Sequence, residues 1–431
     1  MSTQHSDGVE LASQSLSCAV PAPGKAHKFI VSNVTGVFAK PGRLSFILGQ
    51  SGSGKTTFLQ LLRGHAPADG YVRGSVLANG RIVHARHSRR FVQYVPQEDV
   101  FIPSFTAREF LSYTAELRHH STSSSSASTS SVGRGVSVSV TRSAVHKEIP
   151  QDSATAKRAA GVGGGAVDLK KEDAVENILR DLGLSECGDT VIGDPASGIS
   201  GLSGGERRRL SIAVALLSSP PPSCLLLDEC TSGLDSRAAF DMISLLKKLA
   251  REKGLAILLS AHQPSWRICE MADEVTFLYR GEKVFQGGWA AAESHFVSHS
   301  GAMLPKHVNP PDHYLDLLQT TLPQMKPGGV QATWRQIWKD SGCDSNVLHV
   351  VDVNGNFMKD FTNSDQKATG VAFSSKYNTT FWQQYNILTR RGLRDVFKDK
   401  RKLLRGLRMR VFPSLLLGLF FLGLASAQEP D

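Results

Sequence analysis

The sequence of 431 residues has few cysteines, no secretory start and no long hydrophobic run before its last part. Its six cysteines are scattered without a Cys-x-x-Cys pair, which argues against a disulfide scaffold or zinc module and suits a reduced cytosolic compartment. The first residues lack a basic region followed by an apolar core, so we expect no signal peptide. A mean hydropathy of −0.16 excludes a protein built mostly from membrane helices but still allows one short span.

Positive charge is not spread over the chain. Of the net charge of +10, +8 lies in residues 390–410, where ten Lys or Arg stand against Asp395 and Asp399. A nucleic-acid-binding domain would more often carry its basic face within the folded part. We therefore expect no nucleic-acid partner.

The basic cluster directly precedes residues 411–428, an uncharged apolar stretch near the minimum length for crossing a bilayer. A dense basic flank places the preceding chain on the cytoplasmic side of a membrane. We interpret the stretch as one transmembrane helix in a lipid bilayer; the alternative is a buried core helix.

Apolar runs such as Leu44–Leu48 and Cys224–Leu227 alternate with helical patterns, which indicates an α/β domain with a mainly parallel sheet. Phe381, Tyr385 and Leu388 follow helical spacing and predict an amphipathic helix. The expected organisation is a flexible segment (1–27), an α/β domain (28–290) with a disordered low-complexity insertion (121–167) in a helical subdomain, a linker (291–379), a basic amphipathic connecting helix (380–410) and the apolar span (411–428).

The strongest local motif is a phosphate-binding loop that fits the pattern G-x-x-x-x-G-K-[ST]. Its glycines allow backbone N–H groups to surround phosphate oxygens, and the helix after it directs its positive end at the anion. Lys55 is placed to reach the β- and γ-phosphates, and the Thr56 hydroxyl to bind Mg²⁺. The expected ATP-binding residues are Gly49, Gln50, Ser51, Gly52, Ser53, Gly54, Lys55, Thr56 and Thr57.

A second motif is the apolar run 224–227 followed by two acids, Asp228 and Glu229. Because the carboxyl ends of strands border the ligand crevice in an open α/β sheet, both carboxylates are expected to face the phosphates. Asp228 would hold Mg²⁺, and Glu229 would orient the water that attacks the γ-phosphate. An ordinary strand with an acidic turn is the alternative.

Together with these two motifs, four shorter ones resemble those of ATP-binding cassette (ABC) ATPases, in the order that this family uses. Leu202–Glu206 resembles the signature motif, Gln97 the Q-loop glutamine, Ser232–Asp235 the D-loop and His262 the switch histidine. The resemblance implies a P-loop ABC-type nucleotide-binding domain that hydrolyses ATP.

Further runs are similar to the G subfamily of ABC transporters, the white or eye-pigment type, in which the nucleotide domain precedes the membrane domain. These runs are 262–264 (HQP), 205–217 (GERRRLSIAVALL) and 309–316 (NPPDHYLD). The resemblance implies a half transporter that couples ATP hydrolysis to export of a lipid-like or hydrophobic small molecule. It also implies a second half transporter as partner, in a homodimer or a heterodimer.

The resemblance also assigns roles in a head-to-tail dimer. Glu229, His262 and Lys55 are implied to be catalytic, and Gln97 to bind ATP, to sense Mg²⁺ and to couple closure to the membrane part. Metal contacts are implied for Thr56, Gln97 and Asp228. Residues implied to contact ATP across the dimer are Ser203, Gly204, Gly205, Glu206 and Asp235.

Three features depart from the family pattern. Cys230 stands where proline is common, which alters turn rigidity and not chemistry. Gln50 replaces a common loop proline at a position that supplies only backbone, so we expect it to be tolerated. No convincing aromatic residue is placed to stack on adenine; Phe29 is a candidate that lies rather close to the loop.

The family carries about six membrane helices, whereas this sequence stops after one expected span. We expect an incomplete sequence in preference to a native truncation. The alternatives are a truncated regulatory partner of a complete half transporter and a non-transport ABC ATPase.

Overall fold

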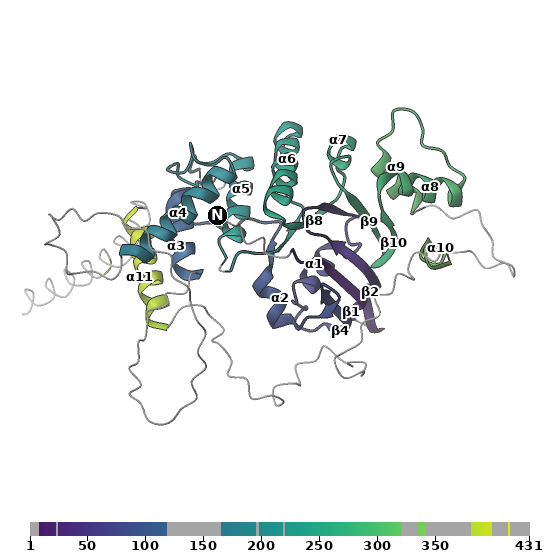
Figure 1. Cartoon of the computed structure of the whole chain (residues 1–431), viewed down its shortest axis with the longest axis horizontal. Coiled ribbons are helices and arrows are strands. Elements are labelled where there is room, and N and C mark those ends of the chain that lie inside the picture. Colours follow the sequence, from purple (N-terminus) through teal and green to yellow (C-terminus); the bar gives the residue numbers. More distant parts are fainter. Residues whose placement is uncertain are drawn as a thin grey trace, which may run out of the picture.

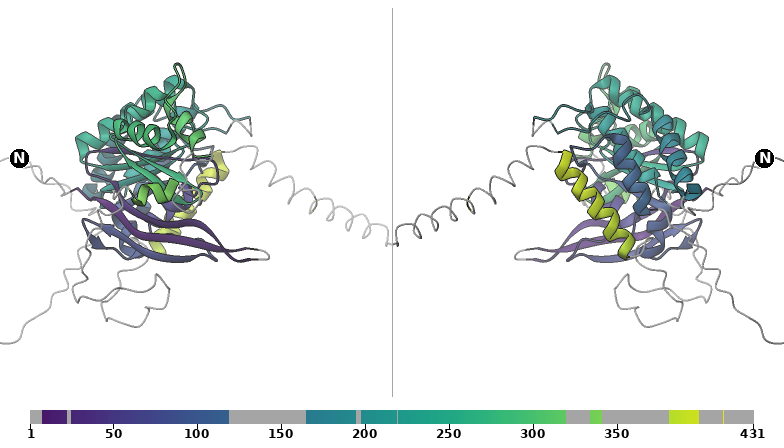
Figure 2. Two further views of the ribbon diagram at one scale, coloured as in Figure 1. Left: turned by 90° about the vertical axis from the view of Figure 1, so that its right-hand side faces the viewer. Right: turned by 90° about the vertical axis from the view of Figure 1, so that its left-hand side faces the viewer.

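A computed structural model describes residues 8–22, 25–118, 165–194, 198–218, 220–319, 334–340 and 381–398, together with Pro413. Two sheets and several helical layers make up the described chain (Figures 1 and 2). The strands are β1 Leu11–Ala22, β2 Lys25–Ala39, β3 Leu44–Leu48, β4 Tyr71–Ala78, β5 Arg81–Ile82, β6 Val92–Val95, β7 Cys224–Asp228, β8 Ala256–Ala261, β9 Glu274–Tyr279 and β10 Glu282–Gly287. The helices are α1 Lys55–Leu62, α2 Ala85–Phe91, α3 Ala107–Arg118, α4 Gly165–Asp181, α5 Gly204–Leu216, α6 Ser236–Lys253, α7 Trp266–Cys269, α8 Trp289–Ser300, α9 Pro310–Leu317, α10 Trp334–Asp340 and α11 Phe381–Lys398.

The larger sheet has six strands in the order β10-β9-β3-β8-β7-β6. Only β10 runs antiparallel to its neighbour, and the other pairs are parallel. Side chains of its central strands alternate between two hydrophobic clusters, with Leu225 on one side and Leu226 on the other. Burial on both faces is typical of parallel sheets and explains why these strands are continuous apolar runs. The predicted α/β domain with a mainly parallel sheet is confirmed.

The smaller sheet is antiparallel, with the order β2-β1-β4-β5. It forms a separate layer (Figure 2), and α1 packs between the two sheets through Phe58 and Leu59. The prediction that residues 1–27 are flexible is wrong for the described part, because β1 lies between β2 and β4. Leu16 and Cys18 are buried there, and buried Ser13 donates its hydroxyl to the Val34 carbonyl. Hydrogen-bonded serines obscured the apolar alternation in the sequence.

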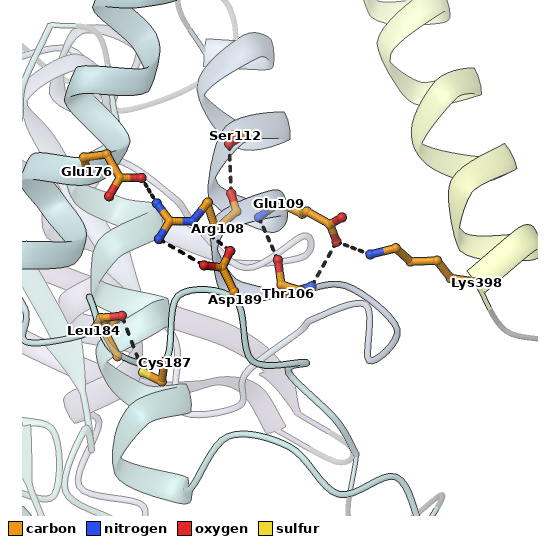
Figure 3. Close-up of polar contacts among 9 residues, drawn as sticks. All are labelled: Thr106, Arg108, Glu109, Ser112, Glu176, Leu184, Cys187, Asp189 and Lys398. Carbon is orange, nitrogen blue, oxygen red and sulfur yellow. Dashed lines mark hydrogen bonds and ion pairs between the residues drawn. The ribbon is translucent and has the colours of Figure 1, made fainter.

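Helices α3, α4 and α5 form a helical subdomain beside the larger sheet (Figure 1). Arg108 connects these elements, because its guanidinium group on α3 forms ion pairs with Glu176 on α4 and with Asp189 (Figure 3). Most of the expected insertion 121–167 lies outside the described residues, and its last three residues belong to the first turn of α4.

The prediction that residues 291–379 are a linker is wrong where the structure describes them. Helices α8, α9 and α10 pack on the edge of the larger sheet. Phe296 stacks on Tyr314, with ring centroids 4.8 Å apart, and Trp334 and Trp338 complete the same aromatic cluster. Large aromatic side chains bury much apolar area from few positions, so a weakly patterned sequence still folds onto the domain.

Helix α11 matches the described part of the predicted connecting helix and lies against α3. Its basic face meets acidic side chains of α3: Arg390 pairs with Glu116, and Arg394 and Lys398 pair with Glu109 (Figure 3 shows the Lys398 pair). No helix in the described parts of the chain is long and apolar enough to cross a membrane. The expected span 411–428 lies outside those parts except for Pro413.

Candidate nucleotide-binding site

The loop between β3 and α1 has a shape that requires glycine. Gly52 and Gly54 have φ angles of +76° and +97°, in the left-handed region that favours glycine. A Cβ at Gly54 would lie 2.5 Å from the Ile30 carbonyl oxygen, and a Cβ at Gly49 would lie 2.5 Å from that of Leu278. The loop is therefore held against neighbouring backbone on two sides.

Lys55 begins α1 and folds back over this loop. Its Nζ donates to the carbonyl oxygens of Gly49 (2.7 Å) and Gln50 (3.1 Å) and lies 3.9 Å from the Glu229 carboxylate. Burial lowers the pKa of Lys55, and the nearby charges of Glu229 and Asp228 oppose that shift. The result is a buried ammonium group directly beside the expected phosphate-binding amides.

Asp228 and Glu229 follow the apolar part of β7, as the sequence predicted, but they differ in environment. Asp228 is only 1% exposed, and its two carboxylate oxygens accept hydrogen bonds from Tyr94 Oη (2.9 Å) and Ser260 Oγ (2.5 Å). Glu229 is more accessible and accepts a hydrogen bond of 2.9 Å from Gln97 Nε2. The two acids are thus fixed by different neighbours and point to different tasks.

Glu229 has a φ of +45°, which is unusual for a residue with a side chain. Such a conformation costs about 1–3 kcal/mol and persists where surrounding contacts enforce it. Here the Glu229 N–H donates to both the carbonyl and the hydroxyl of Ser260. The strain turns the chain sharply after Asp228, at the carboxyl edge of the sheet.

His262 lies just after β8 and reaches the loop from the neighbouring strand. Its Nε2 accepts a hydrogen bond of 3.1 Å from the Ser51 N–H. Gln97, after β6, reaches the same edge through Glu229. The structure therefore brings together the loop 49–57, Gln97, Asp228, Glu229 and His262, because adjacent parallel strands end at one edge of the sheet.

The other predicted residues lie at two helix starts. Ser203 caps α5, and Glu206 forms a reciprocal capping box with it. Hydrogen bonding to the Ser203 N–H is the main reason why the pKa of Glu206 is lowered. Asp235 caps α6 by accepting a hydrogen bond of 2.7 Å from the Ala238 N–H. Within this chain, these three polar side chains therefore shape helix ends.

Gly204 and Gly205 need no special conformation. Neither has a positive φ, and a Cβ would meet neighbours only at 3.6 Å and 3.7 Å, which is ordinary contact. The described chain gives no steric reason for glycine at either position.

Sequence reasoning missed Tyr94, Ser260 and Arg208. Arg208 on α5 is 4% exposed, and its guanidinium group donates to the carbonyls of Asp228 (2.7 Å) and Pro96 (2.6 Å) and to Asp99 Oδ1 (3.0 Å). Arg208 thereby connects α5, the signature helix that begins within Leu202–Glu206, to the backbone at the end of β7 and to the loop after β6 that contains Gln97. Residues 207–209 are all arginine, and nothing in the sequence indicates that the middle one is buried.

The residues present fit a nucleotide with Mg²⁺. Gly49 and Gly54 have no room for a Cβ, Gly52 and Gly54 have positive φ angles, and a buried lysine supplies positive charge. No cluster of three or more His, Cys, Asp or Glu occurs among the described residues that could hold a metal alone. Mg²⁺ suits such a site, because it is commonly bound by one or two protein oxygens together with substrate phosphates.

Cys230 and Phe29 clarify two departures from the expected pattern. Burial raises the pKa of the Cys230 thiol to about 12, so the residue acts as a small buried group. Phe29 is 60% exposed on β2, next to Ile30, whose carbonyl lies against Gly54. It is an accessible aromatic ring close to the loop.

This fold, with a phosphate loop, an acidic strand and a capped signature helix, defines a P-loop nucleotide-binding domain of the ABC type. Residues 34–232 match the family model described as ABC transporter, and residues 262–417 match the one described as ABC-2 type transporter. The chain belongs to the ABC transporter family, and its relatives include Protein white and members of the ABC transporter G family.

Two relatives illustrate the similarity. Protein white of Drosophila melanogaster is 31% identical over 94% of this chain and 50% of its own length. ABC transporter G family member 17 of Arabidopsis thaliana is 36% identical over 68% of this chain and 36% of its own length. The chain therefore spans half or less of these two relatives.

Proposed function

We propose that this chain binds and hydrolyses ATP with Mg²⁺ as the nucleotide-binding part of a G-type half transporter. The observation that carries the proposal is the gathering of Lys55, Asp228, Glu229, Gln97 and His262 around one glycine loop. These side chains come from four places in the fold, since Asp228 and Glu229 share the end of β7, yet their contacts form one continuous network at the sheet edge. Such convergence supports a reaction site better than any single motif.

In the proposed binding role, the amides of residues 49–57 surround the phosphates, and Lys55 supplies a charge that is already desolvated. Thr56, Gln97 and Asp228 are the proposed Mg²⁺ contacts, directly or through water. Mg²⁺ when bound neutralises charge that develops on the phosphate oxygens. Tyr94 and Ser260 keep the Asp228 carboxylate in one orientation.

In the proposed hydrolytic role, Glu229 accepts the proton of the attacking water and His262 helps to hold that water and the γ-phosphate. Phosphoryl transfer depends mainly on positioning and charge, so a carboxylate held on a strained turn is suited to the task. Gln97 donates to Glu229 and is therefore placed to change the orientation of Glu229 when its own loop moves.

We further propose that a second half transporter completes the ATP-binding site. The residues of that partner that would face the nucleotide correspond to Ser203, Gly204, Gly205, Glu206 and Asp235. The two glycines support this, because nothing within the described chain requires them. Backbone amides at a helix start bind anions well if no side chain shields them. The proposed assembly is a homodimer or a heterodimer of such half transporters.

The proposed setting is a membrane, with this domain on the cytoplasmic side and a lipid-like or hydrophobic small molecule as the exported substrate. The match of residues 262–417 to the ABC-2 model and the basic run 390–410 support the membrane setting. The substrate class is inferred from resemblance to the G subfamily.

Two variants test the ATPase proposal. Glu229→Gln is expected to retain ATP binding and to lower hydrolysis about a hundred-fold or more, because general base catalysis contributes that much. Lys55→Ala is expected to weaken ATP binding. ATP titration and phosphate release measure the two effects, with Glu252→Gln and Lys248→Ala on the exposed side of α6 as controls. Unchanged turnover in Glu229→Gln would remove this residue from the mechanism.

A further inference from the structure

The edge strand β2 is bonded on its outer side by side chains instead of by another strand. Its Thr35 and Val37 carbonyls accept hydrogen bonds from Lys283 and Gln286 of β10. An edge strand presents unpaired backbone groups that need partners, and here long polar side chains supply them. Farther along the same edge, the donor comes from α10, which lies beside β2 and β10 in Figure 1.

That donor is Arg335, which is only 7% exposed. Its Nη1 donates to the Ser32 carbonyl (3.1 Å) and its Nη2 to the Asn33 carbonyl (2.9 Å). Its Nε lies 3.7 Å from Glu282, so the charge is balanced. The rigid planar fork of arginine lets one side chain hold two successive carbonyls in a fixed relation.

The part of β2 that Arg335 holds is connected to the phosphate-binding loop by backbone hydrogen bonds through the turn after β9. The Ser32 N–H donates to Gly281 O (2.8 Å), and the Gly281 N–H donates to Ser53 O (3.0 Å). Ser53 lies in the middle of the loop. Three backbone segments from different parts of the sequence are therefore bonded in series between α10 and the phosphate-binding amides.

This series of contacts leaves little room for movement. A Cβ at Gly281 would lie 2.3 Å from the Ile30 carbonyl oxygen, and a Cβ at Gly54 would lie 2.5 Å from the same oxygen. Ile30 is thus wedged between the turn after β9 and the loop. Because packed backbone transmits small shifts instead of absorbing them, a displacement of residues 30–33 would reach the loop.

We propose that Arg335 is a positioning residue for the phosphate-binding loop, and that docking of α10 on β2 sets the affinity of the chain for nucleotide. The inference rests on the proposed ATP binding and adds to it a control from outside the P-loop region. Arg335 acts on the amides that bind phosphate, whereas Glu229 and His262 belong to other strand ends. Its effect therefore falls on affinity and not on the hydrolytic step.

Thermodynamic linkage makes the effect reciprocal. If α10 docking improves nucleotide binding, bound nucleotide must stabilise α10 docking by the same factor.

The test compares variants of the 431-residue chain. Arg335→Ala is expected to raise the dissociation constant and KM for ATP about ten-fold while kcat at saturating ATP stays within two-fold, an effect of ~1.4 kcal/mol. Arg335→Lys is expected to restore part of the affinity, since a lysine can hold one carbonyl but not both. Lys339→Ala, an exposed cation of the same helix, is the matched control. A purely structural anchor would lower the unfolding temperature and leave ATP affinity unchanged, which would overturn the proposal.

A second measurement does not depend on any variant folding. Hydrogen exchange of the unmodified chain, with and without MgADP, is expected to show slower exchange in residues 30–33 and 334–340 when nucleotide is bound. Unchanged exchange there, with nucleotide shown to bind, would overturn the inference alone. If the unmodified chain binds no ATP, or if Lys55→Ala binds it equally well, the proposed function itself fails.

Discussion

Charged side chains hold two regions of this molecule together, one in the buried interior around Arg208 and one at the solvent-exposed contact between α11 and α3. Arg208 lies beneath the nucleotide edge, almost fully buried, and bonds the backbone of two segments, at residues 96–97 and 228–230, as well as Asp99. The basic residues of α11 meet α3 at the surface, where the Arg390 and Arg394 side chains are 56% and 51% exposed. Water and salt weaken the second set of contacts, but they hardly reach the first.

The number of ion pairs in a region does not measure how much the stability of that region depends on them. Three basic side chains attach α11 to α3, while one buried guanidinium group organises the signature helix, the glutamine loop and the acidic strand. Removing one partner from a buried pair leaves an uncompensated charge in the interior, whereas an exposed charge is simply resolvated.

The largest expected effect is at Arg208. Arg208→Ala should destabilise the chain by about 3–5 kcal/mol, because Asp99 and several carbonyls lose a buried donor. Urea unfolding measures the change, and Arg237→Ala provides the control, since Arg237 forms an exposed pair with Asp241 one helical turn away. A loss below about 1 kcal/mol at Arg208 would show that the buried and exposed regions do not differ as described.

An intermediate effect on folding stability is expected from the buried residue His295, and this effect depends on pH. Burial among aromatic rings, with a smaller contribution from His299, lowers its pKa from 6.5 to about 4, and its Nε2 has no hydrogen-bond partner among the residues that the structure describes. Between these pH values the unfolded state binds a proton that the folded state does not. Stability from this residue is therefore fully present above pH 6.5 and is lost as the pH falls toward 4.

The measurement is urea unfolding at pH 7 and pH 5 for the unmodified chain and for His295→Phe. About 2 kcal/mol of the loss between these pH values should disappear in the variant, since phenylalanine fills the site without titrating. An equal loss in both chains would assign the pH dependence to other groups.

The smallest effect is expected on α11. Lys398→Ala should cost less than about 1 kcal/mol, and the loss should shrink further at high salt. Hydrogen exchange of residues 381–398 is the suitable probe, with Thr389→Ala on the exposed face as control. A large loss of stability that does not depend on salt would show that the contact between α11 and α3 behaves like the buried contacts of Arg208.

Much of the nucleotide edge could be predicted because its motifs are local. The glycine loop requires residue types at set spacings, and a strand that ends in Asp228 and Glu229 places them at the carboxyl edge of a parallel sheet. Tyr94, Ser260 and Arg208 could not be found in this way. Their importance depends on burial and on partners between 20 and 134 residues away in the sequence.

The same contrast explains the corrected domain boundaries. The serine-rich composition near the start suggested flexibility, yet Ser13 and its neighbours satisfy their polar groups within a sheet. The weakly patterned stretch after residue 290 suggested a linker, yet Phe296, Tyr314 and Trp334 pack together. Composition describes average solubility, whereas burial depends on which few side chains meet.

Residue types at short spacings are enough to establish the class of the protein, the order of its motifs and the chemistry of its phosphate loop. The folded chain is needed to find which arginine is buried, how Asp228 is oriented and that α10 supports the loop through β2. These properties arise from close packing of distant segments, where a single hydrogen bond or a missing Cβ decides what fits.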